Sequence, residues 1–149
     1  MSEMRITASA DETIACARTF AGRLQRGDVV ALYGDLGSGK TQFVKGVCLA
    51  FKTPTPATSP SYVILNRYNG MDERKSELLL YHFDLYRVKS LAEIYDLGFE
   101  EFLQGDGICF IEWAEMLGQL LPKHRYDVRF SLGKCENERQ IEIAGVSTS

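Results

Sequence analysis

The sequence predicts a three-layer α/β fold with a mixed, mainly parallel central sheet and an antiparallel hairpin. Three observations support this prediction. A glycine-rich turn at 34–41 joins an apolar strand to an amphipathic helix. A second short apolar run, 108–111, ends in an acidic residue. Strand-like segments in 62–83 and 126–143 are separated by turn residues, which indicates antiparallel pairs within the same sheet.

The turn at 34–41 fits G-x-x-x-x-G-K-[ST], the phosphate loop of P-loop NTPases, and the strand 29–33 and helix 42–51 on either side are the context that this motif requires. Its glycines let backbone N–H groups approach a phosphate. Lys40 supplies a mobile charge for the β- and γ-phosphates, and Thr41 offers a hydroxyl to Mg²⁺. The sequence therefore predicts a P-loop NTPase-like nucleotide site made of Gly34, Asp35, Leu36, Gly37, Ser38, Gly39, Lys40 and Thr41.

The composition is that of a globular protein, which we expect to form one domain over residues 1–149. A net charge of −3 is a poor electrostatic footprint for a protein that holds nucleic acid by itself. No apolar run approaches the length of a membrane span, and the N-terminus lacks signal-peptide features, so we expect a cytoplasmic protein with no membrane contact. The four cysteines form no C-x-x-C pair, which favours reduced structural thiols.

A first helix is expected to begin after Ser9, which forms a capping-box pattern with Glu12. We expect it to end at Gly27-Asp28, directly before the strand 29–33. Because this helix precedes the phosphate loop, it can flank the nucleotide base. Thr13 is a candidate for a contact to the base, and the alternative is an exposed helix residue.

The segment 52–61 follows the second helix and holds three prolines and five hydroxyl side chains. Proline at this density argues against a helix or a central strand. A switch-type loop that reaches toward the γ-phosphate and the metal often has this position. A plain linker is the alternative.

Two strands, 62–68 and 77–83, are expected to pair antiparallel, with a turn that opens at Asn69-Gly70. Ser90 and Glu93 form a second capping-box pattern. The remaining expected elements are a short helix ending at Gly98, a helical turn at 99–103, a central parallel strand at 108–111, and a closing hairpin of 126–132 and 139–143.

Two carboxylates stand where phosphate chemistry requires them. Glu112 ends the apolar run 108–111, a pattern that resembles a Walker B strand, and Asp84 ends the apolar run 78–83. Both are expected at the carboxyl edge of the sheet, beside the phosphate loop. One can hold Mg²⁺ while the other orients or deprotonates the attacking water, so Asp84, Glu112 and Lys40 are the candidate catalytic residues. Strand-end caps or salt bridges are the alternative.

Three further residues are possible members of the site. His82 lies two residues before Asp84 and shares its strand face, although a satisfied structural histidine is the alternative. Arg87 is a candidate for contact with phosphate charge, or for a salt bridge elsewhere. Trp113, the only tryptophan, follows Glu112 and is expected either in the core or at a contact to nucleotide or partner.

Taken together, these segments resemble the TsaE family, also called YjeE, the small bacterial ATPase of tRNA threonylcarbamoyladenosine synthesis. The resemblance covers most of the chain. Its generic part is the phosphate loop, and its specific parts are His-Phe-Asp-Leu-Tyr-Arg and Ile-Glu-Trp. The matching segments are 34–41, 59–62, 81–87, 97–98 and 111–113.

The resemblance implies an ATPase that binds ATP or ADP with Mg²⁺ and is weak alone. It implies action with a TsaB–TsaD heterodimer, in which TsaD modifies tRNA, so that this chain meets tRNA only indirectly. By position, Lys40 contacts phosphate, Thr41 and Glu112 serve the metal, and Asp84 belongs to the catalytic centre. The implied switch-like loop is Thr58, Ser59, Pro60, Ser61 and Tyr62.

Two positions depart from the family pattern. Ser61 and Tyr62 replace Thr and Phe, which keeps a hydroxyl and a ring. Ala114 replaces the proline that usually follows Ile-Glu-Trp, which relaxes the backbone after Trp113. Two other functions stay open: a small-molecule kinase, although no Arg-rich lid is evident, and a nucleotide-sensing adaptor without useful turnover.

Overall fold

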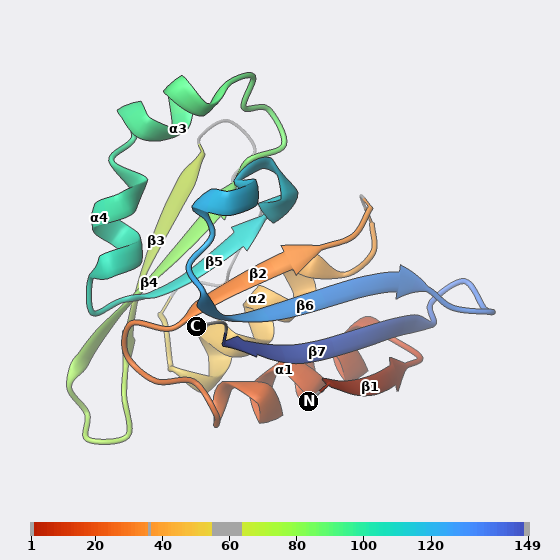
Figure 1. Cartoon of the computed structure of the whole chain (residues 1–149). Coiled ribbons are helices and arrows are strands. Elements are labelled where there is room, and N and C mark those ends of the chain that lie inside the picture. The colour runs from red at the N-terminus through yellow and green to blue at the C-terminus, as the bar shows by residue number, and fades with distance from the viewer. Residues whose placement is uncertain (1, 36, 55–63, 148–149) are drawn as a thin grey trace.

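Seven strands of the described residues form one sheet, and helices cover both of its faces (Figure 1). The structure is a computed structural model that describes residues 2–35, 37–54 and 64–147. In chain order the elements are β1 (Ser2–Thr7), α1 (Ala10–Ala21), β2 (Val29–Tyr33), α2 (Lys40–Ala50), β3 (Leu65–Met71), β4 (Glu77–Asp84), α3 (Leu91–Asp96), α4 (Phe99–Gln104), β5 (Ile108–Glu112), the 3₁₀ turns η1 (Ala114–Met116) and η2 (Gly118–Leu120), β6 (His124–Leu132) and β7 (Arg139–Ser147).

The strand order is β1-β7-β6-β2-β5-β4-β3, with a parallel centre and antiparallel edges. β2 pairs in parallel with β5 and β6, and β4 pairs in parallel with β5. β3, β7 and β1 add antiparallel strands at the two sides. β2 and β5 are short, apolar and buried, as expected for central strands covered on both faces. The predicted fold class, with its mixed sheet and closing hairpin, is confirmed.

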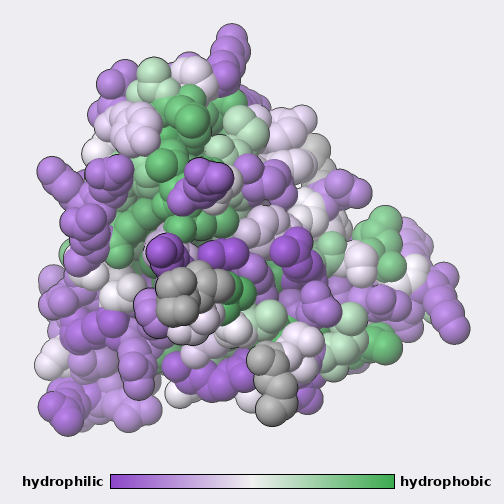
Figure 2. Space-filling model, viewed as in Figure 1, coloured by the Kyte–Doolittle hydropathy of each residue, from purple (hydrophilic) through white to green (hydrophobic). Residues whose placement is uncertain are grey.

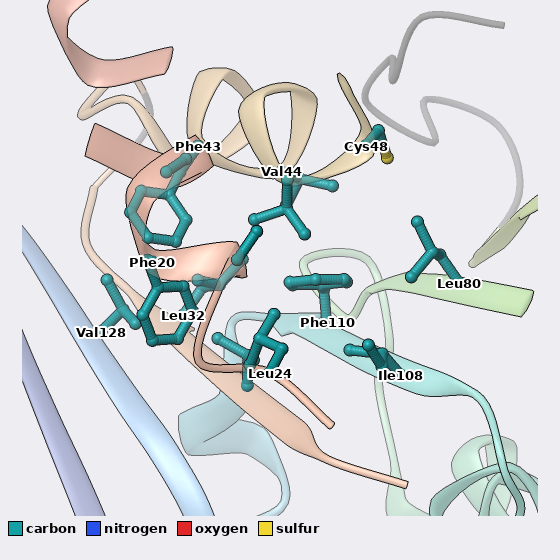
Figure 3. Close-up of a cluster of buried hydrophobic side chains, with 14 of the residues drawn as sticks. Phe20, Leu24, Leu32, Phe43, Val44, Cys48, Leu80, Ile108, Phe110 and Val128 are labelled. Atoms are coloured by element: carbon teal, nitrogen blue, oxygen red, sulfur yellow. The ribbon is translucent and has the colours of Figure 1, made fainter. Parts of the chain in front are cut away.

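One hydrophobic core lies between the sheet and the helices α1 and α2 (Figure 3). Leu32 of β2 and Phe110 of β5 point toward these helices, where they meet Phe20, Phe43 and Val44. The rings of Phe20 and Phe43 lie 5.5 Å apart between centroids. The predicted apolar faces of both helices therefore pack on this side of the sheet.

A second core lies on the opposite face, beneath α3, α4 and η1. Alternate residues of the same strands supply it, including Ala31 of β2 and Ile111 of β5, which meet Ile94 and Phe99. Figure 2 shows hydrophobic surface over the part of the molecule where α3 and α4 lie. Helices on both faces leave the carboxyl ends of β2, β4 and β5 as the edge where a site can form.

Both predicted helix caps are present. Ser9 Oγ accepts from the N–H of Glu12 at 3.1 Å, and Ser90 Oγ accepts from the N–H of Glu93 at 3.4 Å. The predicted end of the first helix was wrong, because α1 stops at Ala21 rather than at Gly27-Asp28. Beyond Ala21 the chain continues in single turns, and the N–H of Gly27 bonds across to Asp106 O.

The turn between β3 and β4 also differs from the prediction. Asn69 and Gly70 lie inside β3, and the chain reverses at 72–76 instead. Gly70 allows a close approach to α2, since a Cβ there would lie 2.9 Å from Phe51 O. Tyr62 and Val63 of the predicted strand 62–68 lie outside the described residues.

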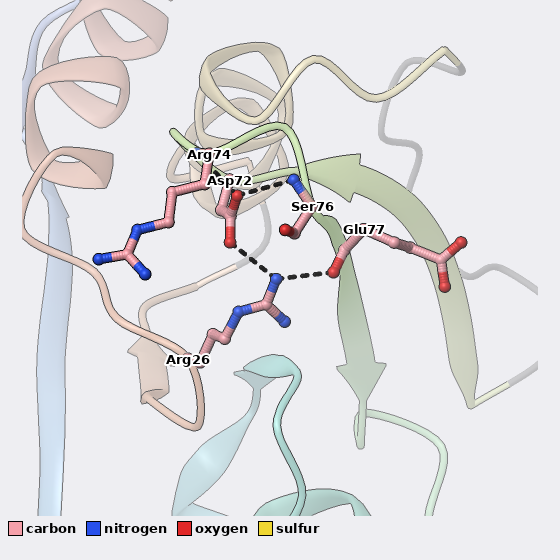
Figure 4. A network of polar contacts seen from close by, with 5 residues as sticks. All are labelled: Arg26, Asp72, Arg74, Ser76 and Glu77. Atoms are coloured by element: carbon pink, nitrogen blue, oxygen red, sulfur yellow. Dashed lines mark hydrogen bonds and ion pairs between the residues drawn. The ribbon is translucent and has the colours of Figure 1, made fainter.

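Asp72 organises this turn (Figure 4). Its Oδ1 accepts from the backbone N–H groups of Arg74 and Ser76, both at 2.9 Å. Arg26, from the loop before β2, donates to Asp72 Oδ2 at 2.8 Å and to Glu77 O at 2.7 Å. A long-range ion pair thus places the turn at Asp72, which a local Asn-Gly pattern does not reveal.

β1 was not predicted. Ser2–Thr7 pairs antiparallel with β7 along the sheet edge, and most of its side chains are exposed. Among the described residues, no helix is long and apolar enough to cross a membrane.

Candidate functional site

The phosphate-loop motif forms a tight connection between β2 and α2. Gly34 follows β2 with φ of 145°, and a Cβ there would lie 2.9 Å from Phe130 O and 2.7 Å from Ser38 Oγ. The N–H of Ser38 donates to Asp35 O at 3.1 Å, which closes the turn, and α2 begins at Lys40. Leu36 lies outside the described residues. Because a Cβ on residue 34 would clash with Phe130 O and Ser38 Oγ, any side chain at this position would disrupt the loop.

Lys40 is held inside the site. Lys40 is the first residue of α2, and only 4% of it is exposed. Its Nζ donates to Gly34 O and lies 4.0 Å from the centroid of the Trp113 ring. Burial lowers the pKa of the Lys40 ammonium, whereas the carboxylates of Glu112, Glu115, Asp84 and Asp35 act in the opposite direction.

Asp84 and Glu112 stand side by side on neighbouring parallel strands. They are register partners at the ends of β4 and β5, as expected for acids that end adjacent strands. Glu112 is 4% exposed, while Asp84 is half-buried. Burial raises the pKa of the Asp84 carboxyl and the charge of Glu112 adds to this, whereas the backbone N–H of Tyr86, which donates to Asp84 Oδ1 at 3.0 Å, lowers it.

His82 is hydrogen bonded to Glu112. Its Nε2 lies 2.5 Å from Glu112 Oε2, and the histidine is fully buried. The other ring nitrogen, Nδ1, has no hydrogen-bond partner within the described residues. His82 therefore contacts the candidate site through Glu112 rather than from inside the cavity.

Trp113 turns the chain away from the sheet directly after Glu112. It adopts a left-handed conformation with φ of 60°, and Ala114 is buried at the start of η1. The N–H of Met116 donates to Trp113 O at 3.1 Å. The turn after Trp113 thus forms with Ala114 at the position where the family usually has proline. The Trp113 ring also lies 4.9 Å from that of Tyr86, between centroids.

A cavity of about 340 Å³ opens where these elements meet. Its lining includes seven of the predicted residues: Gly37, Gly39, Lys40, Thr41, Asp84, Glu112 and Trp113. It also includes five that the sequence analysis missed: Ser9, Ala10, Gln42, Asn137 and Arg139. Gln42 follows the motif directly and could have been included, whereas Asn137 and Arg139 come from the β6–β7 hairpin and carry no local signal.

Several predicted residues do not line this cavity. Thr13 is buried, so the alternative of an exposed helix residue is wrong, and its hydroxyl is hydrogen bonded to that of Thr7 at 2.8 Å. Arg87 is exposed on the turn after β4. The predicted switch-like loop, Thr58 to Tyr62, lies outside the described residues.

A second cavity, of about 430 Å³, lies between β1 and α1. Glu3, Arg5, Cys16 and Arg23 are among its lining residues, and none of the phosphate-loop residues is. Arg23 and Glu3 already form an ion pair at 2.6 Å across it. The convergence of phosphate loop and carboxylates is found in the smaller cavity.

The chain matches a family model over residues 7–141. The family is described as threonylcarbamoyl adenosine biosynthesis protein TsaE.

Relatives of the same description cover nearly the whole chain. A tRNA threonylcarbamoyladenosine biosynthesis protein TsaE from Treponema pallidum is 37% identical over 140 residues, which span 93% of this chain and 98% of that protein. The protein of this name from Bacillus subtilis is 36% identical, over 94% of this chain and 84% of the relative.

A crystal structure of YdiB from Bacillus subtilis has a similar fold. The TM-score is 0.78 at 32% sequence identity, and the superposition covers 99% of this chain and 87% of that one.

Proposed function

Because the chain belongs to the TsaE family, which acts in tRNA threonylcarbamoyladenosine biosynthesis, we propose that it binds ATP or ADP with Mg²⁺ and hydrolyses ATP. One observation carries the proposal. The phosphate loop, Lys40, Asp84 and Glu112 converge on one cavity at the carboxyl edge of the parallel strands. This edge is where α/β sheets commonly bind nucleotides.

The loop fits a phosphate group. Ser38 Oγ is buried and has no hydrogen-bond partner in the described part of the chain, so it has capacity for a ligand. Gly37 and Gly39 line the cavity without side chains. The cavity is also lined by the first residues of α2, Lys40, Thr41 and Gln42. The free N–H groups at a helix start favour an anion. Lys40 is positioned beside the loop as the accompanying cation.

The oxygen donors fit Mg²⁺. Thr41 and Glu112 would hold it, with Asp84 close by, since Mg²⁺ prefers hydroxyl, carboxylate and phosphate oxygens. Within the described ranges, no group of three or more His, Cys, Asp or Glu side chains could hold a metal alone. Mg²⁺ sites with one or two carboxylates and substrate phosphates do not need such a group. When bound, the ion would offset phosphate charge.

The two carboxylates suit different roles. Glu112 is buried and fixed by its hydrogen bond to His82, so it presents oxygen atoms at a constant position. Asp84 is half-buried, and the N–H of Tyr86 donates to its Oδ1. Within the described residues Oδ2 has no hydrogen bond, so it can orient an attacking water. We assign Asp84 to the water and Glu112 to the metal, with His82 as a positioning residue.

The proposed setting is the cytoplasm, with a TsaB–TsaD heterodimer as protein partner. The net charge of −3 supports an arrangement in which the partner, rather than this chain, holds tRNA.

The test is ATP hydrolysis by purified protein, with and without TsaB–TsaD. We expect slow ADP release that the heterodimer changes, and a loss of at least about tenfold in Lys40→Ala and Glu112→Gln. Lys45→Ala on the same helix and Glu100→Gln, an exposed residue of α4, are the controls and should retain activity, since neither lines the cavity.

Other outcomes identify the competing functions. Phosphate transfer from ATP to a small metabolite would replace the proposal by a kinase. Tight nucleotide binding without any turnover, alone or with the heterodimer, would indicate a nucleotide-sensing adaptor.

A further inference from the structure

Arg139 joins the β6–β7 hairpin to the phosphate loop. It is the first residue of β7, and its Nη2 donates to Gly37 O at 3.1 Å, across 102 positions of sequence. Its Nη1 donates to Glu136 O at 2.8 Å and to Glu138 O at 2.9 Å. These carbonyl oxygens fix the guanidinium against the loop.

Some N–H donors of the Arg139 guanidinium are not used in these contacts. An arginine offers an Nε–H and two N–H bonds on each terminal nitrogen. Among the described residues, Nε–H and one Nη2–H of Arg139 have no partner. The side chain lines the cavity and lies close to the loop, since a Cβ at Gly39 would be 4.0 Å from Arg139 Cγ.

The charge of the cavity favours a second cation. The lining holds two carboxylates, Asp84 and Glu112, and two cations, Lys40 and Arg139. Without Arg139, the carboxylates would outnumber the cations at a site that receives a polyanionic nucleotide. Lys40 reaches the cavity from α2 and touches Trp113, whereas Arg139 enters from the hairpin. The two cations can therefore contact different oxygens of one phosphate chain.

We propose that Arg139 binds the phosphate chain of the nucleotide, donating Nε–H and Nη2–H to phosphate oxygens. Paired N–H donors of arginine match phosphate geometry. The proposal rests on the proposed function and adds the hairpin to the nucleotide site. It makes Gly37 and Arg139 a joint unit, in which the loop positions the arginine and the arginine binds the ligand.

The experiment measures dissociation constants of Mg²⁺ with ADP, and of adenosine, by calorimetry at several salt concentrations. The variants are Arg139→Gln, Arg139→Lys and the control Arg129→Gln. Arg129 lies on β6 of the same hairpin, exposed and over the Tyr33 ring, and does not line the cavity. The Arg129→Gln substitution therefore removes one positive charge, as Arg139→Gln does, but outside the cavity.

We expect Arg139→Gln to weaken ADP binding by about ten- to a hundredfold, with adenosine unaffected. Its affinity should also depend less on salt, because one phosphate contact is lost. Arg139→Lys should keep the salt dependence with a smaller loss, and Arg129→Gln should match the wild type.

Three results would overturn the inference. The first is unchanged ADP binding in Arg139→Gln. The second is an equal loss of affinity for adenosine, which would indicate a contact to the base. The third is an equal loss in Arg139→Gln and Arg139→Lys with the salt dependence of the wild type, which would indicate a purely structural role. If the wild type itself failed to bind ADP, the proposed function would fail as well. Wild-type binding that is lost in Lys40→Ala but unchanged in Arg139→Gln would remove only the Arg139 assignment.

Discussion

Gly46 is a single residue on which the packing of two helices depends. It lies on α2 where this helix meets α1, and a Cβ there would be 2.4 Å from Ile14 O and 2.7 Å from Ala17 Cβ. The first of these atoms is backbone, so it cannot move aside by changing rotamer. The position therefore requires glycine despite its low helix propensity.

We predict that Gly46→Ala destabilises the protein by about 1–3 kcal/mol. Alanine would gain up to about 1 kcal/mol of helix propensity, but the clash outweighs that gain. Urea unfolding measures the difference. Gly145→Ala is the control, because its nearest atom would be Tyr126 Cε1 at 3.9 Å, an ordinary contact. Equal stability of Gly46→Ala and wild type would show that α1 can shift at little cost.

The residues of the site differ in how clearly a local sequence pattern indicates them. Lys40 belongs to the phosphate-loop motif, Asp84 and Glu112 end apolar runs, and all three line the cavity. Arg139 sits in a polar hairpin, and only pairing of β6 with β2 brings it to the loop. Thr13 was a candidate for a contact to the base, and its hydroxyl is hydrogen bonded to that of Thr7, on the strand β1 that had no prediction.

At the scale of elements, local signals decided what the sequence revealed. Capping boxes identified the starts of α1 and α3, because the cap and its partner lie within one turn. The β3–β4 turn depends on Arg26, far away in sequence, so its position was predicted wrongly. β1 is an edge strand with little burial, and its pairing with β7 is wholly long-range.

The buried thiols of α2 and β5 predict how stability responds to alkaline pH. Burial raises the pKa of Cys48 and of Cys109 to about 12, from an ordinary value of 9.0. At a pH between these values, the thiol is ionised in the unfolded chain and protonated in the folded chain. The contribution of each thiol to the free energy of unfolding is therefore fully present below pH 9 and is lost as the pH rises. Each thiol should contribute a decrease of about 1.4 kcal/mol per pH unit.

Cys48→Ala should remove one such contribution from the slope of unfolding free energy against pH, measured by urea titration from pH 8 to 11. Exposed Cys135 provides the control variant, Cys135→Ala, which should leave the slope unchanged. Parallel slopes in wild type and Cys48→Ala would contradict the assignment.

At the scale of the whole molecule, the parallel centre of the sheet explains why distant residues meet. β2, β4 and β5 run in the same direction, so the phosphate loop, Asp84 and Glu112 end at one edge. The antiparallel hairpin β6–β7 then adds Arg139 from the other side. The order of strands was not predictable in full, because the pairings of β1 with β7 and of β6 with β2 join segments far apart in sequence and have no local signature.

The central claim is that this shared edge binds nucleotide, and Trp113 reports on it directly. It is the only tryptophan, it lines the cavity, and its ring lies 4.0 Å from Lys40 Nζ. The measurement is a fluorescence titration of the protein with ADP in the presence of Mg²⁺. We predict a saturable change in Trp113 emission that Lys45→Ala preserves and Lys40→Ala abolishes. An emission that stays constant up to about millimolar ADP would contradict the claim, because it would mean an affinity weaker than that of ordinary nucleotide sites.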